Sequence, residues 1–206
     1  MSQNEKSPSS ASMKPQGLYY FPQFLTNTES KAFLQELEKN SQWVGISTSQ
    51  NSRQVIQYGY TYSYTGQPLA RTEPIPDTYM QLFQNKLNEP IYAEIKKVLQ
   101  DWQPEQLLIN KYLPGQGISP HIDHLLNFGS MIVCITLGSG VNIKFTRKGY
   151  APYTIYVEPN SLYIMSDEAR YQWSHSIDAV KSDKVGNLSK SRSTRISLTF
   201  RTVNQN

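Results

Sequence analysis

The segment that organises this chain reads PGQGISPHID and runs from Pro114 to Asp123. It contains His121 and Asp123, and residues two apart on a β-strand point to the same face of the sheet. An imidazole and a carboxylate placed in this way can bind one metal ion. The spacing therefore predicts a strand that carries two ligands of a metal site.

A third ligand has to come from another part of the chain. Only three histidines are present, and those outside the pair are His124 and His175. His124 lies an odd number of residues from His121, so we expect it to face away and to have a surface or packing role. His175 is the remaining candidate, although a structural histidine is the alternative. Two imidazoles and one carboxylate form the facial triad that is typical of non-haem Fe(II) oxygenases.

The length and composition predict one globular domain. A chain of 206 residues, 38% of them hydrophobic, can bury one sizeable core. Residues 1–16 are rich in serine and carry almost no large apolar groups, so we expect a disordered tail before a domain over residues 17–206. The mix of exposed polar segments is compatible with a monomer.

The single cysteine, Cys134, lies in an apolar run, where we expect a core residue. One cysteine argues against a disulfide framework and for a reducing compartment. We find no apolar run long enough to cross a bilayer and no secretion signal. The sequence therefore predicts a soluble cytoplasmic protein, or a nuclear one in a eukaryote.

The positive charge concentrates at the C-terminal end. The net charge is +4 and the isoelectric point is near 9.0. Between residues 181 and 206, Asp183 is the only acidic residue, and the basic residues are Lys181, Lys184, Lys190, Arg192, Arg195 and Arg201. Such a cluster can attract a polyanion such as nucleic acid, and a solvated loop is the alternative.

Two helical regions are expected before residue 103. Thr26 and Glu29 have the spacing of a capping box, which predicts a helix through about Asn40. Asp77 is predicted to cap a second helical region that runs to about residue 100 and breaks at Pro90.

Beyond Trp102 the sequence changes to short apolar runs separated by turn residues. The predicted strands are 107–113, 118–124, 131–137, 141–146, 153–158, 161–166, 170–177 and 194–203. Short strands that follow two helical regions predict a β-sandwich or jelly roll, supported on one face by the helices. The expected fold class is therefore mainly β with flanking helices.

An earlier strand is unusually rich in tyrosine. Residues 54–64 read QVIQYGYTYSY, and their alternation would place Tyr58, Tyr60, Tyr62 and Tyr64 on one face. One interpretation is a half-buried strand whose hydroxyl groups reach water. The other is a surface on which flipped or single-stranded bases stack, each stack contributing roughly 1 to 3 kcal/mol.

The last strand carries a second chemical signal. Arg195 and Arg201 share a face with the two hydroxyl residues between them. At about 3.3 Å per residue the arginines start roughly 20 Å apart, and inward-reaching guanidinium groups would leave room for a small dicarboxylate. Asn110 and Tyr112 share a face on an earlier strand and could bind the same acid. A strand with a polar outer face is the alternative.

Taken in order, these segments resemble those of the AlkB-like Fe(II)- and 2-oxoglutarate-dependent dioxygenases. The resemblance covers residues 17–203. The segments that carry it are Asn110-Lys-Tyr112-Leu-Pro-Gly115, His121-Ile-Asp123, Trp173-Ser-His175 and Arg195-Ile-Ser-Leu-Thr-Phe-Arg201. Within the family, residues 53–64, 137–139 and 166–175 are most similar to the AlkB-type domain of tRNA wobble-uridine hydroxylases.

The resemblance implies a double-stranded β-helix with a catalytic iron centre. The implied Fe(II) ligands are His121, Asp123 and His175. The implied 2-oxoglutarate contacts are Asn110, Tyr112, Arg195 and Arg201. With O2 as the other co-substrate, the implied reaction hydroxylates or oxidatively demethylates a nucleobase of DNA or RNA, tRNA included, and releases succinate and CO2.

A target base has to leave its stack to reach such a centre. The residues expected to contact it are Arg53, Tyr58 and Tyr60. An alternative is a hydroxylase or demethylase of protein side chains. One contiguous groove of tyrosine and basic residues would argue against that alternative. A non-catalytic binding module of the same fold would lack one of the three metal ligands, and none is missing.

Asp167 and Arg170, near the third ligand, are predicted to form a structural ion pair.

Overall fold

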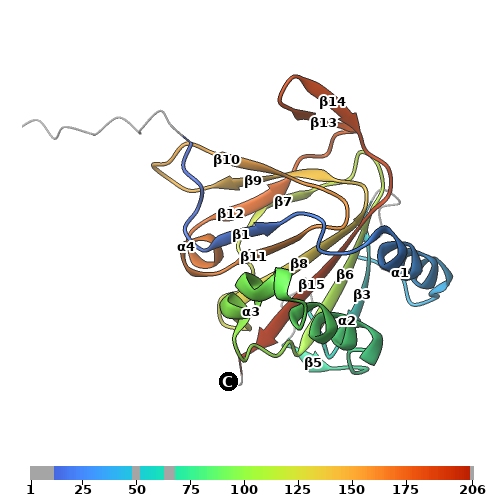
Figure 1. Ribbon diagram of the computed structural model, residues 1–206. Helices are drawn as coiled ribbons and strands as arrows, with labels where there is room; N and C mark the ends of the chain where they lie inside the picture. Colours follow the sequence, from blue (N-terminus) through green and yellow to red (C-terminus); the bar gives the residue numbers. More distant parts are fainter. Residues whose placement is uncertain (1–11, 48–51, 63–67, 205–206) are drawn as a thin grey trace, which may run out of the picture.

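The computed structural model describes residues 12–47, 52–62 and 68–204. Two antiparallel sheets face each other, and helices cover the outer face of the larger sheet (Figure 1). The larger sheet contains, in spatial order, β1 (Leu18–Phe21), β11 (Leu162–Met165), β8 (Phe128–Gly138), β15 (Arg195–Val203), β6 (Gln106–Tyr112), β3 (Gln54–Tyr58) and β2 (Val44–Gly45). The smaller sheet contains β10 (Tyr153–Val157), β9 (Val141–Thr146), β12 (Ser174–Ile177) and β7 (Ile118–His121).

Two short hairpins and five helical segments complete the described fold. The hairpins are β4 (Tyr60–Thr61) with β5 (Ala70–Arg71), and β13 (Ser182–Val185) with β14 (Leu188–Ser191). The helices are α1 (Asn27–Lys39), α2 (Asp77–Leu87), the 3-10 helix η1 (Pro90–Tyr92), α3 (Ala93–Leu99) and α4 (Asp167–Tyr171). This arrangement confirms the predicted mainly β class, a jelly roll with helices on one side.

Helix α1 begins at the predicted capping box. The Thr26 hydroxyl accepts a hydrogen bond from the Glu29 backbone N–H at 3.2 Å, and the Glu29 carboxylate accepts one from the Thr26 N–H at 2.7 Å. These bonds satisfy two backbone donors that the first helical turn leaves unpaired. The helix ends before Asn40, and its apolar side buries Phe33 and Leu37.

The predicted cap of the second helical region is wrong. The residue at the N-cap of α2 is Pro76, and no side chain caps the helix. Asp77 is the first helical residue, where its negative charge favours the positive end of the helix dipole. The predicted break at Pro90 is confirmed, because η1 separates α2 from α3 there.

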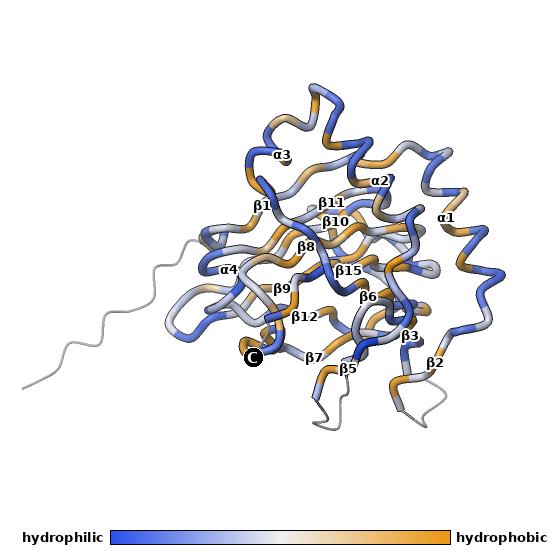
Figure 2. The backbone as a smooth tube through the Cα atoms, turned by 90° about the horizontal axis from the view of Figure 1, so that it is seen from below, coloured by the Kyte–Doolittle hydropathy of each residue, from blue (hydrophilic) through white to orange (hydrophobic). Residues whose placement is uncertain are grey.

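Strand β15 is at the centre of the larger sheet and divides two cores. Its residues Ile196, Leu198 and Phe200 pack with the side chains of α1, α2 and α3. The alternate residues, from Arg195 to Arg201, point toward the smaller sheet and line a cavity. Figure 2 shows hydrophobic stretches recurring along the strands of both sheets, as this two-sided burial requires.

Glycine permits two sharp changes of direction that matter for the site. Gly138 ends β8 with a φ of 75°, and a Cβ there would collide with the Thr194 carbonyl group. Gly59 has a φ of 77° and separates β3 from β4. The predicted strand over residues 54–64 is therefore wrong as one element, and Tyr64 lies outside the described residues.

Two other strand predictions need correction. Strand β7 ends at His121, so Asp123 and His124 lie beyond it. The predicted strand 170–177 is the end of α4 followed by β12. The hairpin β13–β14 was not predicted, because its polar, serine-rich strands lack an apolar alternation.

The predicted tail is only partly described, because residues 1–11 lie outside the described ranges. Within the described part, the Ser12 hydroxyl donates a hydrogen bond to the Pro152 carbonyl at 2.8 Å, and Pro15 is buried. Among the described helices, none has the length and apolar character that crossing a membrane requires.

Replacing Leu198 by Ala tests the core beneath β15. Leu198 is 0% exposed, so Leu198→Ala is expected to lower the free energy of unfolding by about 2 to 5 kcal/mol. The same change at Leu188, which is 66% exposed, should alter it by less than about 0.5 kcal/mol. Urea denaturation of both variants measures the difference, and equal losses would contradict the assigned core.

Candidate metal centre and co-substrate cavity

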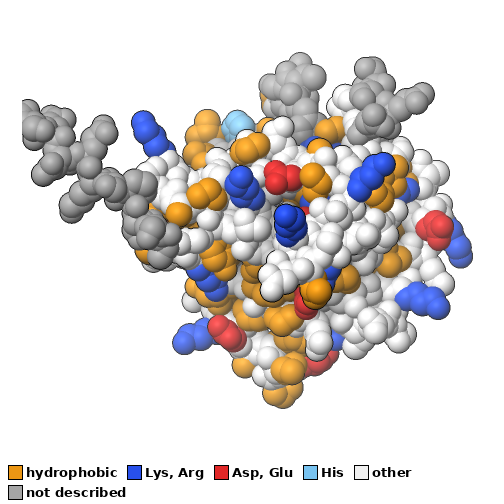
Figure 3. Space-filling model, turned by 90° about the horizontal axis from the view of Figure 1, so that it is seen from above, with side chains coloured by type: hydrophobic (Ala, Val, Ile, Leu, Met, Phe, Trp, Pro, Cys, Tyr) orange, Lys and Arg blue, Asp and Glu red, His pale blue; other side chains and the backbone are white. Residues whose placement is uncertain are grey.

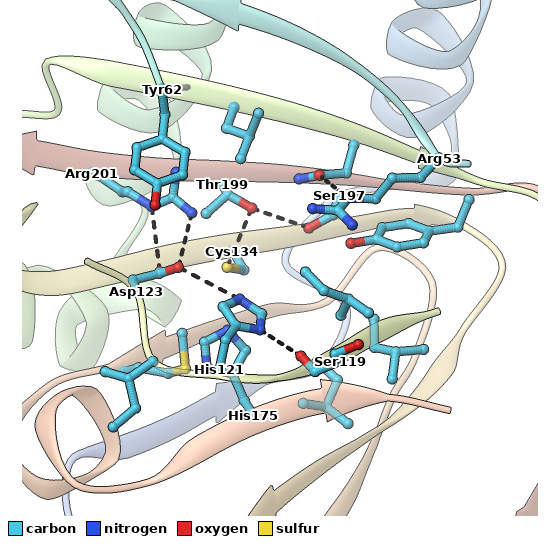
Figure 4. Close-up of a pocket in the computed structure, with 18 of the residues that line it drawn as sticks. Arg53, Tyr62, Ser119, His121, Asp123, Cys134, His175, Ser197, Thr199 and Arg201 are labelled. Atoms are coloured by element: carbon cyan, nitrogen blue, oxygen red, sulfur yellow. Dashed lines mark hydrogen bonds and ion pairs between the residues drawn. The ribbon is translucent and has the colours of Figure 1, made fainter. Parts of the chain in front are cut away.

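The three predicted metal ligands lie together between the sheets. His121 on β7 and His175 on β12 are direct cross-strand partners, and their ring centroids are 4.3 Å apart. Asp123 follows the end of β7 and turns toward the same point (Figure 4). One potential ligand atom from each residue lies within 4.8 Å of the other two. This donor set fits Fe(II), which accepts two imidazoles and one carboxylate.

The Asp123 carboxylate is held by Arg201, which reaches it from the larger sheet. Arg201 Nη2 donates to Asp123 Oδ1 at 3.2 Å, and Nε donates to Oδ2 at 3.4 Å. A further donor of Arg201 binds the Gln106 side-chain oxygen at 2.9 Å. Arg201, predicted as a 2-oxoglutarate contact, is thus already hydrogen-bonded to the carboxylate of a predicted metal ligand.

Hydrogen bonding orients the His121 imidazole. Its Nδ1 lies 2.8 Å from the Ser119 carbonyl oxygen, which can only accept, so Nδ1 carries the proton. The other nitrogen, Nε2, lies 3.8 Å from Asp123 Oδ1 and is the ring atom that faces the other two candidate ligands. A carbonyl partner behind a ligating histidine is the usual way in which proteins fix the ring for a metal.

The protonation states also suit a metal. Burial alone would raise the pKa of Asp123, but Arg201, the two imidazoles and Arg170 lower the pKa to about 2. Burial lowers the pKa of His175 to about 4, and attraction to Asp123 offsets only part of that effect. At neutral pH the carboxyl is therefore ionised and the His175 imidazole is neutral, as metal binding requires.

The loop after Asp123 is held by a buried arginine that sequence reasoning assigned to a different partner. Arg170 donates to the carbonyl oxygens of Asp123 at 2.9 Å, Phe128 at 3.0 Å and Gly129 at 3.0 Å. The predicted Asp167–Arg170 ion pair is wrong, because Asp167 instead accepts a hydrogen bond from the Ser166 hydroxyl.

A cavity of about 420 Å³ extends from the three ligands to Arg195. Arg195 is 4% exposed, and its NH2 group donates to the Thr136 hydroxyl at 3.0 Å. Its Nε, also buried, has no hydrogen-bond partner among the described residues. A buried donor without a partner is costly, and the carboxylate of a bound acid would satisfy it.

The charges of the cavity favour a dianion. Three arginines, Arg53, Arg195 and Arg201, line it, and Asp123 is the only acidic residue among its described lining residues. Asn110 and Tyr112 also line it, on the face of β6 that the sequence predicted. The geometry therefore fits 2-oxoglutarate, with one acidic end at the metal and the other toward Arg195.

Between the predicted metal ligands and Arg195, the cavity is lined by hydroxyl and thiol groups. The sequence did not predict all of them. Cys134 is the register partner of both Tyr163 and Thr199, and its thiol donates to the Thr199 hydroxyl at 3.7 Å. Thr199 lies 3.3 Å from the Ser197 hydroxyl. Tyr163 could not be recognised from the sequence, because only strand pairing places it beside Cys134.

The residues expected to contact substrate do not lie together. Arg53 lines the cavity, where its Nε donates to the Asn110 side-chain oxygen at 3.1 Å. Tyr58 lies an odd number of residues further along, so it faces the helices, where it packs in the core and hydrogen-bonds to Gln42. Tyr60 stacks with Arg71 outside the cavity lining. Tyr58 and Tyr60 therefore do not line the cavity.

Tyr62 takes the position that the earlier tyrosines were expected to have. It lines the cavity with its ring 5.7 Å from that of Phe128 and 6.4 Å from that of His124. His124, predicted to have a surface or packing role, is exposed yet borders the same cavity. Alternation had grouped Tyr62 with Tyr58 and Tyr60, and the turn at Gly59 separates β3 from β4, so Tyr62 lines the cavity whereas Tyr58 does not.

Comparison with known proteins gives the family. Residues 17–201 match the 2OG-Fe(II) oxygenase superfamily, and the chain belongs to that family. An uncharacterized protein, L905, of Acanthamoeba polyphaga mimivirus is 32% identical over 184 residues, which cover 87% of this chain and 81% of that protein. The chain is thus a dioxygenase domain of the class that works with Fe(II) and 2-oxoglutarate.

Further comparisons confirm the predicted resemblance to AlkB-like proteins. The Xenopus tropicalis tRNA (carboxymethyluridine(34)-5-O)-methyltransferase alkbh8 is 31% identical over 208 residues, which cover 92% of this chain. The match covers 32% of that protein, so the chain spans about a third of its length. The solved structure of OsALKBH1 has a TM-score of 0.67 and 15% identity, covers 93% of this chain and 99% of that one, and shows the shared fold.

The metal-free protein should keep His175 neutral well into the acidic range. Its pKa in the folded protein is about 4 against an ordinary 6.5, so an unfolded chain takes up the proton first. The contribution of neutral, buried His175 to the free energy of unfolding is complete above pH 6.5 and is lost as the pH falls toward 4. Histidine NMR spectra recorded from pH 7 to 4 measure the titration, and a midpoint near 6.5 would contradict the burial effect.

Arg201→Lys should weaken metal binding before any co-substrate is added. Lysine keeps the charge but cannot donate to both carboxylate oxygens in a planar fork. Loss of such an orienting partner typically costs 10- to 100-fold in metal affinity. Titration with Mn(II) or Co(II) measures the affinity, and Arg71→Lys, at a site outside the cavity lining, is the matched control. Unchanged affinity in Arg201→Lys would refute the orienting role.

Proposed function

We propose that this chain hydroxylates or oxidatively demethylates a nucleobase in nucleic acid, with tRNA as the first candidate substrate. The observation that carries the proposal is the single cavity that joins a two-histidine, one-aspartate cluster to an unpaired buried arginine donor. Such a cavity suits a ferrous ion at one end and a dicarboxylic acid along its length. No described feature favours a protein side chain as the substrate.

In this proposal, His121, Asp123 and His175 bind Fe(II), with the Asp123 carboxyl ionised and the His175 imidazole neutral at neutral pH because of their lowered pKa values. Arg201 keeps the Asp123 carboxylate oriented, and the Ser119 carbonyl keeps His121 in the tautomer that presents Nε2. When bound, Fe(II), 2-oxoglutarate and O2 supply the oxidation, which converts the acid to succinate and CO2 and hydroxylates a C–H bond of the substrate.

The co-substrate would be bound by side chains that come from neighbouring strands. Arg195 offers its buried Nε to the distal carboxylate, while Asn110 and Tyr112 contribute an amide and a phenol from β6. Arg53 holds the Asn110 amide through a hydrogen bond of 3.1 Å. These donors are preorganised by packing, so little side-chain entropy is lost when the acid binds.

Support for a nucleobase comes from the relatives and from the aromatic groups that border the cavity. The name of the Xenopus relative assigns that protein to a uridine of tRNA. Tyr62 and His124 border the cavity, and aromatic rings of this kind stack on bases that have left their own stack. The tyrosines do not form one continuous surface, so the predicted stacking face is not part of this support.

The outcome of the oxidation depends on the group that carries the C–H bond. A hydroxylated N-methyl group loses formaldehyde and leaves the free base. A hydroxyl group on a carbon substituent stays in place. Mass spectrometry of nucleosides distinguishes the two products, so one assay tests both forms of the reaction.

Incubation of the protein with Fe(II), 2-oxoglutarate and total tRNA or alkylated DNA should yield a modified nucleoside and an equal amount of succinate. His121→Ala and Asp123→Ala should abolish succinate formation while the far-UV circular dichroism stays unchanged, because each removes a metal ligand from a folded protein. In the absence of nucleic acid, His124→Ala, which removes the remaining histidine but no predicted metal ligand, should retain turnover of 2-oxoglutarate and serves as the control.

Two results would count against different parts of the proposal. Normal 2-oxoglutarate turnover in His121→Ala or Asp123→Ala would refute the ligand assignment. Turnover by the wild-type protein without a modified nucleoside in either substrate would refute the nucleobase and leave the iron site standing.

A further inference from the structure

Gln106 is a fully buried amide beside the predicted metal centre. It is 0% exposed, and the strand register pairs it with Arg201 across β6 and β15. Cross-strand partners share a face of the sheet, so the amide lies on the side that faces the cavity. A buried amide needs hydrogen-bond partners for both its oxygen and its nitrogen. The two partners of Gln106 belong to different parts of the site.

These partners fix the direction in which the amide points. Its Oε1 accepts a hydrogen bond from Arg201 Nη1 at 2.9 Å, and its Nε2 donates one to the Tyr60 carbonyl oxygen at 3.0 Å. A guanidinium group can only donate and a carbonyl oxygen can only accept, so the oxygen and the nitrogen of the amide cannot exchange places. The position therefore requires a side chain that donates and accepts at once, as glutamine does and methionine does not.

The bond to Gln106 sets the plane of the Arg201 guanidinium group. At 2.9 Å it is shorter than the two bonds from Arg201 to the Asp123 carboxylate, which are 3.2 and 3.4 Å. The group is planar, so holding its third nitrogen determines how the other two meet the carboxylate. Figure 3 shows Lys and Arg side chains spread over the surface, whereas Arg201 is 6% exposed. Water therefore has little access to replace Gln106 as a partner.

The bond to Tyr60 holds the beginning of the segment that carries Tyr62. Gly59, with a φ of 77°, turns the chain so close to the sheet that a Cβ on it would collide with the backbone just before β6. This turn brings the Tyr60 carbonyl to Gln106. Two residues further on, the Gln57 side chain accepts from the Tyr62 N–H at 2.6 Å and donates to the Tyr62 carbonyl at 3.2 Å.

Tyr62 also approaches the same arginine. It lines the cavity, and Figure 4 shows its side chain pointing toward Arg201 and Asp123. Its ring centre is 5.7 Å from that of Phe128, and the Phe128 ring centre is 4.5 Å from Cζ of the Arg201 guanidinium group. Gln106 is therefore connected to Tyr62 in two ways, through the backbone and through the packed arginine.

We propose that Gln106 is a positioning residue that couples the predicted metal ligand Asp123 to the part of the cavity wall formed by Tyr62. Through Arg201 it orients the carboxylate, and through Tyr60 it places the tyrosine segment. Such coupling is reciprocal, so fixing the carboxylate restricts the segment and restricting the segment favours the same carboxylate orientation. The inference rests on the metal ligands of the proposed function, and its tests use no nucleic acid.

The first test replaces Gln106 by Met, which has a similar length and makes neither hydrogen bond. Loss of an orienting partner typically costs 10- to 100-fold in metal affinity, so Gln106→Met should bind Co(II) about 10-fold more weakly. The visible absorption spectrum of bound Co(II) should change too, because the carboxylate is oriented differently. Gln35→Met, the same change at an exposed position of α1, is the matched control and should retain both properties.

A second variant separates positioning from stability. Gln106→Met removes buried hydrogen bonds, and a less stable protein can bind a metal more weakly for that reason alone. Leu198→Ala removes packing on the helical side of β15 and leaves the cavity side unchanged. It should be less stable in urea than the wild-type protein and should retain the wild-type Co(II) affinity and spectrum.

Hydrogen exchange measures the coupling in the unaltered protein. The amides of Gly59, Tyr62 and Thr72 form hydrogen bonds within the tyrosine segment or with its neighbours. Saturation of the wild-type protein with Co(II) should slow their exchange by about 5-fold or more, the lower end of common coupling between sites. Exchange in α1 should not change. In Gln106→Met saturated with Co(II), the slowing at the three amides should be lost.

Several results would overturn the inference. Wild-type Co(II) affinity in Gln106→Met would do so, and so would an equal loss of affinity in Leu198→Ala. Unchanged exchange at the three amides in Co(II)-saturated wild-type protein decides against the coupling even if Gln106→Met does not fold. Failure of the wild-type protein to bind Co(II) is a different outcome, because it removes the metal ligands of the proposed function and this inference with them.

Discussion

The ion pair between Arg201 and Asp123 joins the two sheets at the point where the three predicted metal ligands meet. Arg201 belongs to the central strand of the larger sheet, and Asp123 follows a strand of the smaller one. A buried carboxylate is expensive unless its charge is paired and its oxygens are hydrogen-bonded, and Arg201 supplies both. The position of the carboxylate therefore depends on how the sheets face each other. His121 and His175 add to this centre through direct strand pairing.

Strand alternation on β15 connects stability with chemistry. Leu198 and its neighbours on one side bury against the helices, while Thr199 and its neighbours on the other line the cavity. A shift of one residue in the register would exchange the two faces and bury the arginines in the helical core. Packing of the apolar face against the helices therefore fixes the register of β15. This register also positions the side chains of the opposite face, which line the cavity and do not contact the helical core.

The tyrosine-rich strand shows how a correct local pattern can give a wrong surface. Alternation over residues 54–64 holds only up to Tyr58, because Gly59 adopts a left-handed conformation and turns the chain. Tyr58 then belongs to the core and Tyr62 to the cavity. The parity of Arg53 and Tyr58 already placed them on opposite faces, so part of this outcome could have been read from the sequence.

The sequence by itself determined the fold class and the α1 capping box, because these depend on local spacing, and the scarcity of histidine identified His121, Asp123 and His175 as the candidate ligands that the structure brings together. His175 was identifiable since the chain offers few histidines. The partners of Arg170 and Arg201 were decided only by the tertiary structure. Both arginines lie at least 41 residues along the chain from the groups they bind, and an arginine pairs with whichever oxygen the packed sheets and helices bring within its reach.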